Sequence, residues 1–196
     1  MTRLDTKKVS LTAVLSALTI VVAYSKGLSV PFFPGLIEFM TVLIFISGFH
    51  CGSIVGCFVG FISLTMYMLI PAPFAQPGAW IFTISPMLLL LMGALGALFG
   101  IVGGLMRRMR GNARIGQRFV FEMALIGLTL TFAYDILSSV AFYLAYPIYP
   151  SILDAIYLTF VPLYYVYPPI IHTVTNTIVF AIIAPTLVRT LRSFQM

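Results

Sequence analysis

The sequence predicts an all-α integral membrane protein: a compact bundle of six transmembrane helices that forms a single membrane domain over residues 1–196. Hydrophobic residues make up 61% of the chain, charged residues make up only 8%, and the mean hydropathy is +1.08. Soluble domains carry about 25% charged residues. Spans of about 20 residues each would use most of the chain. The composition therefore leaves no room for a soluble catalytic domain.

The expected spans follow the apolar segments of the chain. These segments are 9–28, 36–49, 52–70, 79–106, 119–145 and 164–188. Residues 36–70 contain little polar sequence, yet one helix of that length would measure roughly 52 Å, against a hydrocarbon core of about 30 Å. We therefore expect the chain to reverse direction near residues 49–52.

The basic residues cluster beside these spans and predict their orientation. Of the eleven, three lie near the start, five lie between Arg107 and Arg118, and two are Arg189 and Arg192, so that Lys26 is the exception. Six spans place both termini and the arginine-rich loop on one side, which the positive-inside rule assigns to the cytoplasm. We thus expect a multi-pass protein of the cell membrane with cytoplasmic termini. The net charge of +6 then reflects topology, and no nucleic-acid partner is expected.

The predicted outer connections, 29–35, 71–78 and 146–163, are rich in proline and aromatic residues. The first two each place Phe and Pro before a Pro-Gly pair, which is a turn signal. The third contains several tyrosines and a short interfacial helix predicted from about 151 to 160. The tyrosines indicate either an aromatic belt at the membrane surface or a stacking wall for a flat ligand, to which Trp80 would add.

Small residues recur at four-residue spacing in several spans. The glycines in this pattern are Gly48, Gly52, Gly56 and Gly60, followed by Gly96, Gly100 and Gly104. Such spacing lets helix backbones approach closely, so we expect these glycines to pack the bundle. The first span carries a similar pair, Ala13 and Ala17, which would either pack internally or dock another membrane protein.

Ionisable residues inside membrane spans are costly, and each is therefore a candidate functional residue. Glu38 lies at the predicted outer start of the second span, where the helix dipole would also favour a carboxylate. Asp135 lies within the fifth span and must face the bundle interior, a partner or a water-filled cavity. Glu122 is explained more simply by an ion pair with Arg118, four residues earlier.

The sixth span carries His172 and Asn176, which lie four residues apart and hence on one helix face. They follow Pro168-Pro169, which should begin or kink that helix. A polar ligand site in the outer half of the bundle would explain these side chains. Hydrogen bonding between helices without a ligand would also explain them.

Other reactive residue types show no catalytic or metal-binding pattern. Cys51 and Cys57 lie six apart in an apolar stretch and are expected to be reduced and structural, and His50 is expected to cap the turn at the predicted reversal. The chain contains no His-Glu-x-x-His pair and no Gly-x-Ser-x-Gly turn. An enzyme is therefore not expected, and no metal site is predicted.

The order of these features resembles the substrate-binding S components of energy-coupling factor (ECF) vitamin transporters. The shared features are a basic N-terminus before an Ala-x-x-x-Ala first helix, a proline-rich outer loop, glycine-rich middle helices and an arginine-rich loop before the fifth helix. The stretch Pro168-Pro169-x-x-His172-x-x-x-Asn176 is similar to the sixth-helix pattern of the family.

The resemblance implies a substrate-capture subunit that binds a vitamin or related micronutrient from the outer side. Residues carried over to that site are Glu38, Trp80, Asp135, Tyr164, His172 and Asn176. It also implies docking onto a transmembrane T component through Ala13 and Ala17, with two cytoplasmic ATPase subunits supplying energy from ATP. The chain itself, surrounded by membrane lipid, would carry no cofactor.

Two other classes compete with this interpretation. A stand-alone small-solute channel or secondary carrier would often show internal repeats with broken helices. The paired Pro-Gly loops hint at such a repeat, but the two halves do not otherwise align. A membrane assembly protein without a ligand would use the tyrosines only as an interfacial belt.

Overall fold

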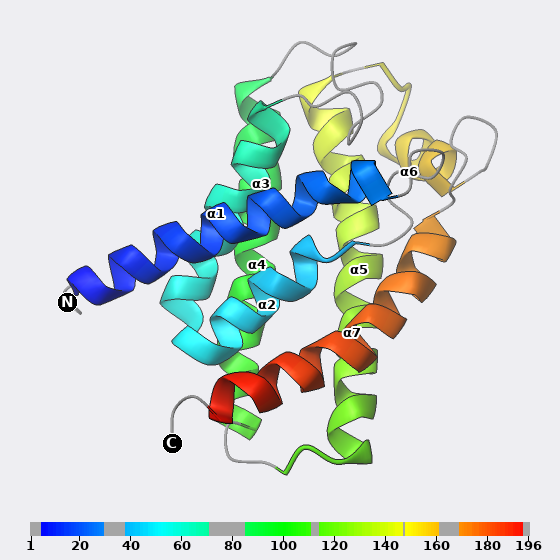
Figure 1. Cartoon of the computed structure of the whole chain (residues 1–196). Helices are drawn as coiled ribbons and strands as arrows, with labels where there is room; N and C mark the ends of the chain where they lie inside the picture. Colours follow the sequence, from blue (N-terminus) through cyan, green and yellow to red (C-terminus); the bar gives the residue numbers. More distant parts are fainter. Residues whose placement is uncertain are drawn as a thin grey trace.

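The structure is a computed structural model that describes residues 5–29, 38–70, 85–110, 114–146, 148–160 and 169–193. These residues form seven helices (Figure 1). Their bounds are α1 Thr6–Ser29, α2 Met40–Cys51, α3 Ser53–Leu69, α4 Pro86–Arg110, α5 Gln117–Ala145, α6 Ile152–Phe160 and α7 Pro169–Ser193. The predicted all-helical class is confirmed, and α6 coincides with the short interfacial helix expected near 151–160.

Four of the described helices, α1, α4, α5 and α7, are long and apolar enough to cross a membrane. The other two predicted spans correspond to α2 and α3, which have 12 and 17 residues. At 1.5 Å per residue, α2 reaches only about 18 Å, less than the hydrocarbon core of about 30 Å. The bundle therefore combines four full-length helices with a shorter helical pair.

The chain reverses direction at Gly52, as the sequence predicts. Gly52 has a φ of 96°, and its N–H donates to the Gly48 carbonyl 2.8 Å away, which ends α2. A positive φ is accessible to glycine at little cost because it lacks a Cβ. The next helix begins at once with Ser53. Gly52 is thus a turn residue, and it does not take part in the predicted seam.

The remaining glycines of the pattern bring α3 and α4 into backbone contact. A Cβ added to Gly100 would lie 1.9 Å from the Gly56 carbonyl oxygen, and one added to Gly60 would lie 2.0 Å from the Gly96 carbonyl oxygen. No side chain fits at these positions without moving a helix. Gly48 joins the same contact, since its Cβ would lie 1.9 Å from the Gly100 carbonyl oxygen. The expected small-residue packing is confirmed.

The helix α1 crosses α3 obliquely (Figure 1), and its two faces differ in burial. Its buried face carries Thr12, Ser16, Thr19 and Ala23, a spacing of three and four residues that follows one side of a helix. Its other face is exposed along most of its length and includes Ala13 and Ala17. The Ala-x-x-x-Ala pair therefore does not pack inside this chain.

Polar contacts tie the basic ends of the helices together. Glu122 of α5 accepts from Arg118 Nε at 3.3 Å, which confirms the predicted pair, and from Arg110 Nη2 of α4 at 2.7 Å. Arg107 donates to the carbonyl of His50 in the last turn of α2. Cys51 and Cys57 are free thiols. These contacts hold α2, α4 and α5 together at the arginine-rich end of the bundle.

The helix α7 packs along α5 and reaches α2. The described part of α7 begins at Pro169, a residue type that suits the first helical turn, where its missing N–H has no partner to lose. Residues 164–168 of the predicted span lie outside the described residues. Phe180 fills the space between these helices: its ring lies 5.5 Å from that of Phe45, and Gly127 of α5 leaves room for it. Proline likewise starts α4 at Pro86, after the predicted 79.

Candidate functional site

Four of the predicted site residues lie on three elements that meet in the bundle. Glu38 lies two residues before the start of α2, Asp135 lies in α5, and His172 and Asn176 lie on α7. Glu38 is 6% exposed, Asp135 is 7% exposed and Asn176 is fully buried. Residues far apart in sequence are thus brought into one buried cluster.

The upper layer of this cluster is an imidazole placed between two carboxylates. His172 Nδ1 lies 3.0 Å from Asp135 Oδ1, and His172 Nε2 lies 3.0 Å from Glu38 Oε2. Ionised carboxylates only accept hydrogen bonds. When both carboxylates are ionised, both ring nitrogens donate, and the ring is then the cationic imidazolium. The layer links α5 and α7 to Glu38, which lies just outside the N-terminus of α2.

A hydroxyl also holds Asp135 in place. Thr173 Oγ1 donates to Asp135 Oδ2 at 3.2 Å, while His172 occupies the neighbouring oxygen. Charge-assisted hydrogen bonds of this type are stronger than neutral ones. Two neighbouring residues of α7 thus fix the orientation of one carboxylate of α5.

The lower layer lies one helical turn further along and is built around the amide of Asn176. Its Nδ2 donates to Thr41 Oγ1 at 3.0 Å and to Thr131 Oγ1 at 2.8 Å. Its Oδ1 is buried without a hydrogen-bond partner among the described residues. An unpaired buried acceptor costs about 1–3 kcal/mol. The amide therefore offers one polar atom to a ligand or a water molecule.

Helix periodicity explains why the two layers are in register. His172 and Asn176 are four residues apart on α7, and Thr131 and Asp135 are four apart on α5. Residues at this spacing lie one above the other on a helix face. Thr41 lies in the first turn of α2, close to Glu38. Each layer thus takes one group from each of the three elements.

Sequence reasoning missed the two threonines of the lower layer. Thr41 and Thr131 are buried hydroxyls in otherwise apolar helices. The sequence did contain one indication of Thr131: it lies four residues from Asp135, the same spacing as between His172 and Asn176. Threonine is common in membrane helices because its hydroxyl can bond to the backbone of its own helix, so the residue type alone does not identify a site.

Two predicted site residues, Trp80 and Tyr164, lie outside the described residues. Of the outer tyrosines that the structure describes, Tyr146 accepts from the Ser85 N–H at 3.2 Å, and Tyr157 of α6 is 64% exposed. These positions fit an interfacial belt as well as a wall near a ligand.

The chemistry of the cluster is that of polar recognition. It offers carboxylate oxygens, an imidazole, an amide and hydroxyls within the membrane bundle. Among the described residues, no group of three or more His, Cys, Asp and Glu side chains is arranged to hold a metal ion. A hollow between α4 and α5 is lined by none of the cluster residues.

Comparison with known proteins adds the family. Residues 7–188 match the family model described as "ECF transporter, substrate-specific component". Neither the search of curated proteins nor the search of solved structures found a match. The match covers nearly the whole chain, including α1, the buried cluster and most of α7. The chain therefore belongs to the substrate-specific components of ECF transporters, the substrate-capture subunits of ECF importers.

Proposed function

We propose that this S component binds a vitamin or related small micronutrient through the buried cluster of Glu38, Asp135, His172 and Asn176. The observation that carries the proposal is the two-layer arrangement, in which the lower layer still presents an unpaired amide oxygen among the described residues. A ligand polar group that paired with Asn176 would remove the cost of that unpaired atom.

Membership of the family establishes the general role of the chain, to which this proposal adds a binding site. ECF S components are multi-pass membrane proteins that capture substrate, and they are binding subunits rather than enzymes. They carry no cofactor, and the ATP is hydrolysed by partner ATPases. A stand-alone channel or carrier therefore does not describe this chain. Its partners are a substrate and an ECF module.

Burial supports a ligand role for the cluster beyond helix packing. Carboxylates in a membrane span are expensive to desolvate, and a purely packing role could be filled by apolar side chains at lower cost. This chain places Glu38 and Asp135 against one histidine. Such groups orient the polar edge of a ligand in sites that are otherwise apolar.

We further propose that Trp80 and Tyr164 stack on the ring of the ligand. Both belong to segments that the sequence places at the outer end of the bundle. Aromatic side chains combine a large apolar face with a polar edge, which suits a flat heterocycle. The polar cluster would then bind the edge of the ligand, while the aromatic residues cover its face.

The exposed face of α1 is the proposed docking surface for a transmembrane T component, which would join two cytoplasmic ATPases. Ala13 and Ala17 lie on this face and are not used in packing α1 onto α3. Small residues four apart let another helix approach closely. Their exposure favours docking over the alternative of internal packing.

Equilibrium binding to the purified chain tests the proposed site, with riboflavin, thiamin, biotin and folate as probes. Asp135→Asn and Asn176→Ala should weaken the binding seen with the wild type, while size-exclusion profiles stay monodisperse. Glu122→Gln is the matched control, because Glu122 is also an acidic residue of α5 but pairs with arginines at the other end of the helix. Equal affinity in all four proteins would remove the cluster from the site.

A further inference from the structure

The polar face of α5 continues beyond the buried cluster, toward the end of the helix that is remote from the arginines. Thr131, Asp135 and Ser139 lie four residues apart, on one helix face, and all three are buried. Ser139 Oγ lies 3.0 Å from Thr159 Oγ1 of α6. The helix α6 also contacts α7, which carries His172 (Figure 1). A short helix therefore lies against the cluster, one helical turn beyond Asp135.

Few side chains of α6 are buried. Ala155 is the one buried residue among the nine of this helix, whereas α2, with 12 residues, buries nine. Leu153 is 76% exposed and Tyr157 is 64% exposed. Beside the hydroxyl contact, the Phe160 ring meets the Phe132 ring of α5 edge to face, with centroids 5.9 Å apart. The helix α6 is thus held to α5 by a small interface.

The hydroxyl contact between α5 and α6 can break without leaving an unpaired proton. A hydroxyl carries a single proton to donate, and Ser139 Oγ lies 2.7 Å from the Asp135 carbonyl oxygen of its own helix, closer than it lies to Thr159. Thr159 donates to the Ala155 carbonyl at 2.8 Å within α6. Each hydroxyl therefore keeps a backbone acceptor when the two helices separate, so separation avoids the penalty of an unpaired polar group.

The helix α6 also carries its own N-terminal cap. Ser151 Oγ accepts from the Asp154 N–H at 3.1 Å and donates to Asp154 Oδ2 at 2.6 Å. The Ala155 N–H donates to the Ser151 carbonyl at 3.1 Å. Such a cap pairs backbone donors that the first helical turn leaves free. These bonds lie within residues 151–155, so α6 does not need α5 to satisfy its first turn and can move as a rigid unit.

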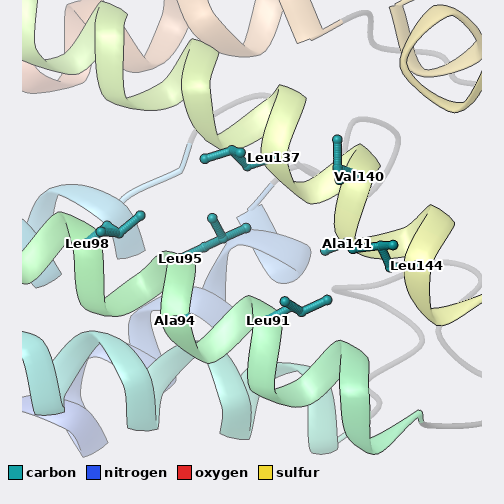
Figure 2. Close-up of a pocket in the computed structure, with 8 residues that line it drawn as sticks. All are labelled: Leu91, Ala94, Leu95, Leu98, Leu137, Val140, Ala141 and Leu144. Atoms are coloured by element: carbon teal, nitrogen blue, oxygen red, sulfur yellow. The ribbon is translucent and has the colours of Figure 1, made fainter. Parts of the chain in front are cut away.

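Another opening, the hollow between α4 and α5, offers no polar path to the cluster (Figure 2). All eight side chains that line it are Leu, Val or Ala, and none belongs to the cluster. A polar group that left water through this hollow would lose its hydrogen bonds without gaining protein partners, which is costly. At α6, by contrast, Ser139 and Thr159 present hydroxyl oxygens in line with Asp135. The described residues therefore favour entry at α6.

We propose that α6 is a rigid lid over the buried cluster, and that the substrate enters where α6 separates from α5 at Ser139 and Thr159. The inference rests on the proposed function, because a lid has a role only if the cluster binds a substrate. Closure returns Thr159 to Ser139 and shields the polar groups from water, as lids do over other binding sites. The lid should therefore control how fast the substrate binds and leaves rather than how tightly it binds.

Locking α6 to α5 with a disulfide tests the lid. Ser139→Cys and Thr159→Cys are combined in the full chain with Cys51→Ser and Cys57→Ser, and the 3.0 Å between the native hydroxyl oxygens suits a disulfide. The probes are radiolabelled riboflavin, thiamin, biotin and folate. Oxidation before the vitamin is added should slow binding, and oxidation afterwards should slow release, each by roughly tenfold or more. Reduction should restore both rates. Equal rates in the oxidised and reduced protein would overturn the proposal.

Thr159→Val tests the same contact without a disulfide. This variant removes the hydroxyl and should raise the rates of binding and release together by roughly threefold to tenfold, which leaves Kd nearly unchanged. Thr129→Val is the matched control and should change neither rate, because the Thr129 hydroxyl of α5 is exposed and donates to the Leu125 carbonyl of the same helix. A weaker Kd for Thr159→Val with an unchanged binding rate would make Thr159 an ordinary ligand contact and would contradict the lid.

The outcomes separate the lid from the binding site. Loss of binding in Asp135→Asn, together with equal rates in the oxidised and reduced cysteine pair, would overturn the lid and keep the site. A wild-type chain that binds none of the four vitamins would overturn both proposals. So would an affinity that Asp135→Asn leaves unchanged.

Discussion

The imidazole of His172 joins two carboxylates that come from different elements, so the geometry of the cluster depends on a few charged atoms. Asp135 holds Nδ1 and Glu38 faces Nε2, each at 3.0 Å. Both ring nitrogens are thus occupied, so the imidazole fixes the orientation of the two carboxylates relative to each other. Replacing a single carboxylate oxygen of the cluster should therefore change the ligand affinity measurably.

Asp135→Asn should lower ligand affinity roughly tenfold to hundredfold, because a hydrogen bond to a charged group contributes about 1.5–3 kcal/mol and 1.4 kcal/mol corresponds to tenfold. Isothermal titration with whichever vitamin binds the wild type measures the change. Glu122→Gln should leave the affinity within twofold, about 0.4 kcal/mol, since Glu122 lies at the arginine-rich end of α5. An equal loss in both variants would indicate a general effect on folding.

Sequence could predict which residues of the cluster are unusual, but not how they pair. Charged and amide groups stand out in apolar spans because burying them is costly, and this criterion found Glu38, Asp135, His172 and Asn176. Pairing depends on how three helices meet, which no local spacing encodes. For the same reason Thr41 and Thr131 were missed: their hydroxyls matter only because the Asn176 amide lies between them.

At the scale of elements, the glycine seam fixes the distance between α3 and α4. Gly100→Ala should destabilise the chain by about 1–3 kcal/mol or more, as overpacking does, because the new Cβ would meet the Gly56 carbonyl oxygen at 1.9 Å. Thermal unfolding in detergent should show a lower Tm. Gly116→Ala is the control, since a Cβ there meets nothing within 4 Å. A Tm for Gly100→Ala equal to that of the control would contradict the described packing.

The four-residue glycine spacing predicted this seam, but it did not distinguish its members. Gly52 continues the same spacing, yet it forms the turn between α2 and α3 with a φ of 96°. Gly52 differs from the other glycines because the backbone reverses direction there. The length of the apolar stretch 36–70 predicts this reversal, whereas the glycine spacing does not. The start of α4 also differs from the predicted position, because Pro86 suits the first turn of a helix.

At the scale of the whole molecule, binding and transport should separate on different surfaces. Ala13→Trp and Ala17→Trp should abolish uptake by the complete transporter while leaving ligand affinity unchanged, because both residues lie on the exposed face of α1. Uptake into proteoliposomes and titration of the purified chain give the two readouts. Ile178→Trp, at a residue of α7 that is 53% exposed, is the matched control and should transport normally.

Loss of uptake in the Ile178→Trp control would show that any bulky exposed residue interferes, and the docking surface would not then be confined to α1. Transport by proteoliposomes that contain this chain without the ECF module would contradict docking itself. The orientation with cytoplasmic termini enters the same test, since the ATPases must meet the docked complex on that side.

Native mass spectrometry of the gently purified chain, with identification of any small molecule that it releases, tests whether the buried cluster binds a substrate. We expect a bound molecule of vitamin size on the wild type and its loss from His172→Ala, because that imidazole links both carboxylates of the cluster. A wild-type chain that stays empty after incubation with a panel of vitamins and their precursors would contradict a binding role for the cluster. So would a ligand retained equally by His172→Ala.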